Sequence, residues 1–380
     1  MMVATATSAA ILFVPLLARD TLHLDVSAIG LIGAVYGLAV FASSYIFGRA
    51  ADVYSRRKII VAGLLIASFG FLSQSFVSIF PSATYLMVSR AIAGFSVGIA
   101  APALSAYVYE SRHRFGRFLS FGSLGYGLGA GLAGAIAVYV GGWAVFVFGS
   151  LCLFSAFLAA LSLPEVRQRR VTRVSLFPRE TLRSGWPIYL GYFLRHTGAN
   201  SVWIIFSLYI VKLGASYAEV GIITAVNSVC QFFFMNRVDK WDSKFLIHLG
   251  TLVSVAAFIV YTLAPSWLWL IPGQIMIAFA WSCMYVGSNL YLLKDSKERA
   301  TASGLLQSSM SLAVIIGPIL GGAVAGMFAN EIDGYKATMY GAALLSAIAF
   351  FMFYFGIRSH EKGIRESRTE HVLESRSHNS

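Results

Sequence analysis

Residues 48–58 read Gly48-Arg-Ala-Ala-Asp52-Val-Tyr-Ser-Arg56-Arg57-Lys58, a short polar stretch between two long apolar runs. Each run exceeds the about 20 residues that a helix needs to cross a bilayer, so the stretch predicts a turn between two membrane-spanning helices. Its basic residues cluster at one side of that membrane, and Asp52 supplies a carboxylate that can pair with an arginine there. The same alternation of apolar run and short polar break extends along the whole chain.

The composition indicates a membrane protein. Hydrophobic residues make up 57% of the 380 residues and charged residues 12%, whereas an ordinary soluble domain carries about 25% charged residues. The mean hydropathy is +0.72. These values exclude a disordered chain, a secreted disulfide scaffold and almost any soluble enzyme. Twelve helices of about 20 residues fit the length, with short loops and no separate soluble domain.

The apolar runs number twelve, and each is predicted to be a helix because lipid-facing backbone must satisfy its own hydrogen bonds. They span 1–18, 27–48, 58–79, 82–109, 117–139, 142–163, 185–211, 217–236, 244–264, 266–292, 300–327 and 337–357. The predicted fold class is all-α, with six-helix bundles at 1–163 and 185–357. Residues 164–184 form a basic linker between the bundles, and the charged tail 358–380 is expected to be disordered.

The basic residues gather on one side of this arrangement. With the first break placed outside, the outer loops hold only Arg19, Lys212 and Lys336, whereas the inner loops and the tail hold 24 of the 29 basic residues. This bias follows the positive-inside rule and predicts a multi-pass protein of the plasma membrane with both termini in the cytoplasm. The net charge of +12 then reflects topology and lipid contact, and we expect no nucleic-acid partner.

The two halves carry traces of an internal duplication. Residues 28–35 (AIGLIGAV) resemble residues 219–226 (EVGIITAV), and Asp52 recurs as Asp239 at one shared offset from a following glycine. In this alignment the first run is about ten residues shorter than its counterpart at the inner end. We therefore expect a short first helix or a chain that starts late.

The loop at 48–58, the twelve runs, the linker and the duplicated halves together resemble the major facilitator superfamily, a large family of secondary transporters, over essentially the whole chain. The spacing Gly-x-x-x-Asp-x-x-x-Arg-Arg is similar to the family signature between helices 2 and 3. The resemblance implies that two bundles rock about a central site. It also implies a gating latch formed by Gly48, Asp52, Arg56 and Arg57. The second loop keeps Asp239 and lacks the glycine, so its role as a latch is left open.

One arginine lies deep in the fourth run, which contains Ser89-Arg90-Ala-Ile-Ala-Gly94-Phe-Ser-Val-Gly98. A charge at this depth is costly unless it faces a polar interior, so Arg90 is a functional candidate. The pattern is similar to the helix 4 motif of the superfamily's proton antiporters, with an alanine in place of a glutamine, and this implies a role in proton coupling. The alternative is a structural arginine that backbone carbonyls and water satisfy. Gly94 and Gly98 offer a small face for helix packing.

The seventh run contains Arg195 and His196. Arg195 lies about 15 Å along the helix from Gly185 at 1.5 Å per residue, which is near the middle of a bilayer. It is a candidate to hold an anionic group of a substrate, and His196 is a candidate proton carrier because its ordinary pKa lies in the physiological range. Adjacent residues point about 100° apart on a helix, so we expect Arg195 rather than His196 to face the cavity. Helix packing is the alternative for His196.

Other polar and aromatic side chains at this depth are further candidates for contact with a substrate. They are Asn200, Asn227, Gln231, Tyr36 and Trp203. Asn227 and Gln231 are four residues apart and share a helix face. Hydrogen bonds between helices are the alternative role of the amides, and a place at the membrane interface is the alternative role of the aromatics.

Glycine and cysteine patterns exclude several other activities. Residues 129–134 match GxGxxG, but no strand, turn and helix surround them, so a dinucleotide site is rejected. In the eleventh run Gly317, Pro318 and Gly321 resemble part of an exporter signature that belongs to helix 5 of antiporters, and here we assign them to helix packing. The cysteines lie singly in apolar runs, which predicts reduced, buried residues and neither a metal site nor a cofactor. They are Cys152, Cys230 and Cys283.

These features favour a secondary transporter rather than an enzyme, acting as a monomer in the lipid bilayer on a small-molecule substrate with protons as the coupling ion. The aromatic, weakly charged interior, Arg90 and the resemblance to drug-efflux members favour proton-coupled efflux of small amphipathic compounds. The lack of a deep carboxylate favours an alternative, uptake or exchange of a small organic anion held by Arg90 and Arg195. A membrane receptor or scaffold that does not transport is another alternative, although a static protein needs no latch.

Overall fold

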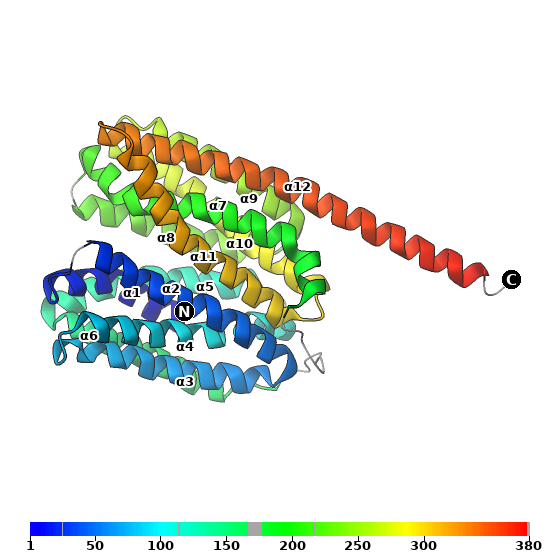
Figure 1. Ribbon diagram of the computed structural model, residues 1–380, viewed down its shortest axis with the longest axis horizontal. Coiled ribbons are helices and arrows are strands. Elements are labelled where there is room, and N and C mark those ends of the chain that lie inside the picture. Colours follow the sequence, from blue (N-terminus) through cyan, green and yellow to red (C-terminus); the bar gives the residue numbers. More distant parts are fainter. Residues whose placement is uncertain (25, 113–114, 166–176, 216, 378–380) are drawn as a thin grey trace.

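The computed structural model describes residues 1–24, 26–112, 115–165, 177–215 and 217–377, and over these residues the chain is helical without a strand (Figure 1). Two 3₁₀ turns, Phe76–Ser78 and Trp267–Trp269, precede α4 and α10. The α-helices are α1 (Met2–Asp20), α2 (Val26–Val53), α3 (Arg56–Ser75), α4 (Ala83–Arg112), α5 (Phe115–Tyr139), α6 (Gly142–Leu161), α7 (Arg179–Lys212), α8 (Tyr217–Val238), α9 (Ser243–Thr262), α10 (Leu270–Asp295), α11 (Arg299–Gly326) and α12 (Glu331–Ser377).

The helices have the dimensions of membrane spans. Within the described residues, nine of them are individually long and apolar enough to cross a membrane. α7 is not among these nine; it carries Arg195 and several other polar residues, which lower its mean hydropathy. The all-helical fold of twelve helices that the sequence predicts is confirmed.

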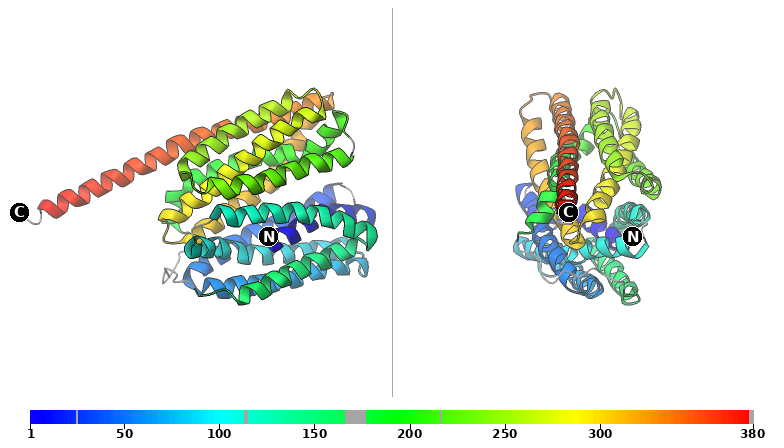
Figure 2. Two further views of the ribbon diagram at one scale, coloured as in Figure 1. Left: turned by 180° about the vertical axis from the view of Figure 1, so that it is seen from behind. Right: turned by 90° about the vertical axis from the view of Figure 1, so that its right-hand side faces the viewer.

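The helices form two bundles that lie one beside the other (Figures 1 and 2). In the first, α1 packs on α5 and α6, and α4 packs on α2 and α3. In the second, α7 packs on α11 and α12, and α10 packs on α8 and α9. Most of the predicted linker falls on 166–176, outside the described residues. The helix after it begins at Arg179, six residues before the predicted start at 185.

The last helix corrects one prediction. A disordered tail was expected from residue 358, but α12 continues as one helix of 47 residues to Ser377 and projects beyond the bundles (Figure 1). The tail contains no proline. It is rich in glutamate and arginine, which have high helix propensity, so nothing in it interrupts the helix that the apolar part of α12 begins.

The first helix packs on α5 from its first residue. It has 19 residues, and the backbone carbonyl of Met1 lies against Gly125, ten residues into α5. The hydroxyl of Ser8 donates to the carbonyl oxygen of Tyr126 over 2.7 Å, which fixes α1 on α5. The first residue of the chain therefore lies part-way along the bundle and not at its end (Figure 1).

Candidate functional site

The two bundles meet at one end of the molecule, which we call the basic end and define by the turns that join α2 to α3, α4 to α5, α8 to α9 and α10 to α11. There the carboxylate of Asp52, at the end of α2, accepts hydrogen bonds from the backbone N–H groups of Ala300 over 3.0 Å and of Thr301 over 2.7 Å. The Thr301 hydroxyl donates to the same carboxylate over 2.7 Å. Asp52 is fully buried. It therefore caps the N-terminus of α11 from the opposite bundle, where the helix dipole favours a negative charge.

A chain of ion pairs extends this contact. The Arg56 guanidinium donates to Asp52 over 2.8 Å and also to the carboxylate of Glu110, at the end of α4. The other oxygen of Glu110 accepts from Arg299 of α11 over 3.0 Å. Glu110 is 5% exposed and Arg56 2%, so these pairs act with little screening by solvent. Both acids of the first bundle thus bind the first turn of α11 in the second.

Close backbone packing accompanies the charges. A side chain at Gly48 would place its Cβ 2.8 Å from the carbonyl oxygen of Ala300 and 3.2 Å from the Cα of Gly304. Only glycine lets α2 and α11 approach this closely. Arg57 has a different contact, because it donates to the carbonyl oxygen of Leu161 at the end of α6 over 2.6 Å. The structure thus brings Gly48 and Asp52 to the other bundle. Arg56 is bonded to Asp52 and Glu110, and this bond of Arg57 stays within the first bundle.

A second meeting of the bundles lies between α5 and α8 and repeats the first. A Cβ at Gly116, in the first turn of α5, would lie 2.6 Å from the Cβ of Asp239 and would also collide with the carbonyl oxygen of Met235. Asp239 is the counterpart of Asp52 in the sequence duplication. It lies beside the N-terminus of α5 as Asp52 lies beside the N-terminus of α11, so the loop without the glycine also reaches the opposite bundle.

Polar side chains continue the α5–α8 contact into the molecule. The hydroxyl of Ser123 donates to the Oε1 of Gln231 over 3.0 Å, and Gln231 donates to the Oδ1 of Asn227 over 2.6 Å. Asn227 in turn donates to the carbonyl oxygen of Gln274 on α10 over 3.3 Å. The predicted pair Asn227 and Gln231 therefore shares a face, and it links three helices across the two bundles.

All these contacts lie toward the basic end. On the α2–α11 side they run from Asp52 to the hydrogen bond between the Ser308 hydroxyl and the carbonyl oxygen of Phe41, at 2.9 Å, and to Gly37 beside Ile315. On the α5–α8 side they run from Gly116 to Gly127 beside Ser228. These contacts between the bundles run from the basic end to about the middle of α2, α11, α5 and α8. The bundles are therefore closed at the basic end.

Arg90 lies inside the first bundle. It is 3% exposed, and its Nη1 donates to the Oε1 of Gln74 on α3 over 3.3 Å. Its guanidinium carbon lies 4.0 Å from the centre of the Tyr36 ring on α2, which is a close cation–π contact. Gly94, one turn further along α4, packs against the backbone of Tyr36. The structure thus brings the candidates Arg90 and Tyr36 together and adds Gln74.

Arg195 lies inside the second bundle, and its partner is not on the interface. Its Nε donates to the hydroxyl of Ser254 on α9 over 3.0 Å, and its guanidinium carbon lies 5.8 Å from the centre of the Trp281 ring on α10. The ring of His196 stacks on Trp281 with the centroids 5.1 Å apart. The sequence predicts that Arg195 faces a cavity between the bundles. The observed hydrogen bond instead directs its side chain toward α9 of its own bundle.

The remaining candidates, Asn200 and Trp203, both lie on α7. The Asn200 amide donates to the backbone carbonyl of His196 over 2.8 Å, and Trp203 is 37% exposed and packs edge-on against Phe206. The glycines assigned to helix packing do face other helices. Gly98 packs against Ser43 and Ser44 of α2, Gly317 against Asn200, and Gly321 against Ser201 of α7, while Pro318 lies inside α11.

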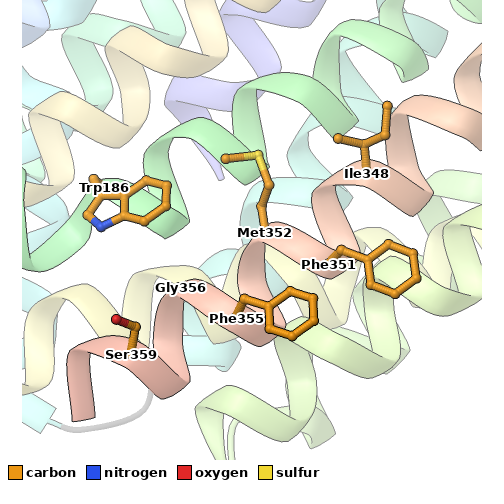
Figure 3. Close-up of a pocket in the computed structure, with 7 residues that line it drawn as sticks. All are labelled: Trp186, Ile348, Phe351, Met352, Phe355, Gly356 and Ser359. Atoms are coloured by element: carbon orange, nitrogen blue, oxygen red, sulfur yellow. The ribbon is translucent and has the colours of Figure 1, made fainter. Parts of the chain in front are cut away.

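An apolar groove of about 490 Å³ lies between α7 and α12 (Figure 3). Its lining is Trp186, Ile348, Phe351, Met352, Phe355, Gly356 and Ser359. All of these residues belong to two helices of one bundle, and Ser359 alone has a polar side chain apart from the Trp186 indole. The groove therefore lacks the polar groups that orient a substrate, and it lies away from the interface of the bundles.

Sequence analysis did not single out several residues of these networks as site residues, among them Glu110, Arg299 and Gln74. Glu110 ends an apolar run and Arg299 begins one, which is also where any surface charge would lie. Gln74 stands among serines at the end of α3. The positive-inside rule could have pointed to Glu110 and Arg299. It places the helix end that carries each of them on the same side of the membrane as Asp52.

Comparison with known proteins agrees with this geometry. The family model described as Major Facilitator Superfamily matches residues 1–186 and 188–377. The chain belongs to the Major Facilitator Superfamily. As a member of the Major Facilitator Superfamily it is a multi-pass membrane transporter, and the resemblance drawn from the loop at 48–58 is confirmed.

Two similar proteins are named as resistance proteins. Multidrug resistance protein 1 of Bacillus subtilis is 24% identical over 322 residues, covering 80% of this chain and 82% of the relative. Quinolone resistance protein NorA of Staphylococcus aureus is 22% identical over 328 residues, covering 82% and 84%. The crystal structure of the fucose:proton symporter FucP of E. coli shares the fold with a TM-score of 0.73, at 15% identity, over 93% of this chain and 96% of that one.

Proposed function

We propose that this transporter is a proton-coupled exporter of small amphipathic compounds and works by alternating access. One observation carries the proposal: the two bundles are joined at the basic end by an acid that caps a helix of the opposite bundle, Asp52 on the N-terminus of α11. Such a contact can open and close as a unit, because its donors are backbone groups that α11 presents in any orientation of the bundles.

The positive-inside rule supports a direction for this gate. The basic end carries Arg49, Arg56, Arg57 and Lys58, and the α12 tail leaves the bundles there. Under that rule the basic end faces the cytoplasm of a plasma membrane. The described state is then closed to the cytoplasm, and opening it requires the loss of the Asp52 and Glu110 contacts with α11.

The interior supports an amphipathic substrate. The described α-helices carry their acidic residues near their ends, and among the deep positions we find amides, hydroxyls and aromatic rings such as Tyr36 and Trp281. A site of this kind binds by apolar contact and a few hydrogen bonds, which suits compounds of varied shape. The names of the Bacillus and Staphylococcus relatives support the same substrate class.

Arg90 is the proposed coupling residue. It is held by Gln74 and Tyr36 in a fixed place inside the first bundle, and it is paired with no carboxylate in the described part of the chain. A positive charge in that position disfavours a second positive charge and so changes the proton affinity of a nearby group. Loss of the charge should therefore uncouple substrate transport from the proton gradient.

The test is transport in proteoliposomes under an imposed pH gradient, read with a fluorescent lipophilic cation. We expect the wild-type protein to move the dye only with the gradient and the Arg90→Ala variant to lose at least ten-fold in gradient-driven rate. The matched control is Arg183→Ala, which removes an exposed arginine near the start of α7 and should transport like the wild type. A wild-type protein that moves no dye under either polarity of gradient would overturn the proposal.

A further inference from the structure

The second bundle contains a buried positive charge that forms no ion pair among the described residues. Arg195 lies near the middle of α7 and is 1% exposed. The acid that α7 carries, Glu180, is 15 residues away, which is about 22 Å along a helix. α9 carries no acid between Ser243 and Thr262, and the acid of α10, Asp295, is 14 residues beyond Trp281, or about 21 Å.

The guanidinium of Arg195 is also incompletely bonded. Its Nε donates to Ser254, whose hydroxyl donates in turn to the carbonyl oxygen of Gly250 over 2.9 Å and so offers Arg195 a lone pair only. The Nη2 of Arg195 is fully buried and has no hydrogen-bond partner among the described residues. An unpaired donor on a buried cation is costly, so a group that the chain does not supply is expected at this atom.

Two further donors lie on the helices that carry Arg195 and its partner Ser254. They are the hydroxyls of Tyr192, about one turn before Arg195 on α7, and of Tyr261, about two turns after Ser254 on the same face of α9. Both side chains are fully buried, and neither hydroxyl oxygen has a partner in the described part of the chain. The cluster of Arg195, Tyr192 and Tyr261 thus presents three unused donors, and among the described residues no carboxylate is bonded to any of them. This is the chemistry of an anion site.

We propose that this cluster binds a small monovalent anion of the halide class inside the second bundle, between α7, α9 and α10. The charge of Arg195 favours an anion over a water molecule, which would leave that charge uncompensated. The near-complete burial of Arg195, Tyr192 and Tyr261 favours an ion of one atom over a bulky group. The site is separate from the proposed drug pathway, because Ser254 belongs to α9, which packs on α10 and α12 of its own bundle.

Trp281 offers a direct readout. Its ring centre lies 5.8 Å from the guanidinium carbon of Arg195, so a heavy halide bound to Arg195 will quench its fluorescence. The purified full-length protein is titrated with bromide against gluconate at constant ionic strength, and the signal of the Trp281→Phe variant is subtracted. We expect a saturable loss of the Trp281 signal in the wild type. For Arg195→Gln we expect an affinity for bromide at least ten-fold weaker than that of the wild type.

The matched control is Arg183→Gln, which removes an exposed arginine of the same helix and should leave bromide affinity unchanged. If Arg195→Gln does not fold, Tyr261→Phe removes one donor without a change of charge, and we expect it to weaken bromide binding several-fold. Quenching that rises linearly with bromide and is equal in the wild type, Arg195→Gln and Tyr261→Phe overturns the proposal.

A second arm identifies the source of the anion. Bromide titrations are repeated with a short aliphatic carboxylate present. A halide site is expected to show no competition, and an unchanged bromide affinity supports the proposal as stated. Competition by the carboxylate would overturn the restriction to halides and assign the site to an anionic group of a transported compound. Neither outcome depends on proton-coupled drug transport, so failure of the drug assay and failure of the anion site are distinguishable.

Discussion

The carboxylate of Asp52 accepts the backbone N–H of Thr301 at 2.7 Å, although the two residues are 249 positions apart in the chain. One lies at the end of α2 and the other in the first turn of α11, so this bond joins the two bundles. Its acceptor is a full negative charge and its donor belongs to the positive end of a helix, which makes it stronger than a bond between neutral groups. The closed state of the basic end depends on it.

Asp52→Asn should open the basic end. The amide keeps the shape of the acid and loses its charge, both toward α11 and toward Arg56, and a charge-assisted hydrogen bond contributes about 1.5–3 kcal/mol. We therefore expect a shift of roughly ten- to a hundred-fold toward the open state. The measurement is the rate at which a membrane-impermeant maleimide labels Ser308→Cys, in a background without the native cysteines. Ser308 is buried between α2 and α11 in the closed state. Equal rates with and without Asp52→Asn would contradict the role of this charge.

Gly48→Ala should also open the basic end, through a steric clash and not through a loss of charge. The added methyl group collides with the Ala300 carbonyl oxygen and must push α2 and α11 apart, and overpacking of this kind costs about 1–3 kcal/mol. The control is Gly33→Ala on the same helix, because a Cβ at Gly33 meets nothing within 4 Å. Maleimide labelling of Ser308→Cys should rise for the first variant and stay at the parent rate for the second. The reverse order would show that helix propensity, not contact, decides the result.

Asp239→Asn should weaken the second contact, between α8 and the start of α5. Because Asp52 lies against the start of α11 and Asp239 against the start of α5, the two acids share no partner, and their effects on the free energy of opening should add. The double variant Asp52→Asn/Asp239→Asn is therefore expected to label Ser308→Cys faster than either single variant, by about the product of the two single effects. A double variant no faster than Asp52→Asn alone would show that α5–α8 takes no part in closing the basic end.

Gln74→Leu should imitate the loss of Arg90. The variant leaves the guanidinium with the Tyr36 ring as its remaining described partner, and an unsatisfied buried donor costs about 1–3 kcal/mol. We expect a lower thermal midpoint in detergent and a gradient-driven dye transport reduced toward that of Arg90→Ala. The neighbouring Ser73→Ala removes a hydroxyl that bonds the Gly70 carbonyl of its own helix and should change neither. Full transport by Gln74→Leu would place Arg90 outside the coupling path.

The latch illustrates how far sequence alone reaches. The spacing of Gly48, Asp52 and Arg56 predicts a charged turn at one side of the membrane, and the family resemblance adds a gate. The partner of Asp52 could not be predicted, because its donors are backbone N–H groups and every helix N-terminus in the sequence offers the same groups. Only the packing of α2 on α11 selects Ala300 and Thr301.

The deep arginines show a different limit. Costly charges in apolar runs made Arg90 and Arg195 candidates at once. The direction in which each side chain points depends on which helices surround it. A rotation of α7 by a fraction of a turn would exchange the interface for α9, and nothing in a single run fixes that rotation. Gln74 and Ser254, the partners that do fix it, are common residue types that the sequence gives no reason to select.

The movement of the two bundles is tested most directly by double electron–electron resonance on the full-length protein in nanodiscs. One pair of spin labels, at Lys58→Cys and Lys297→Cys, spans the bundles at the basic end; the other, at Ile79→Cys and Leu263→Cys, spans them at the opposite end, and all four positions are exposed. With a transported compound and a change of pH, we expect the first distance to lengthen while the second shortens, and Asp52→Asn to produce part of this change alone. Two distances that stay fixed, or that change in the same direction, would contradict alternating access about the Asp52 latch.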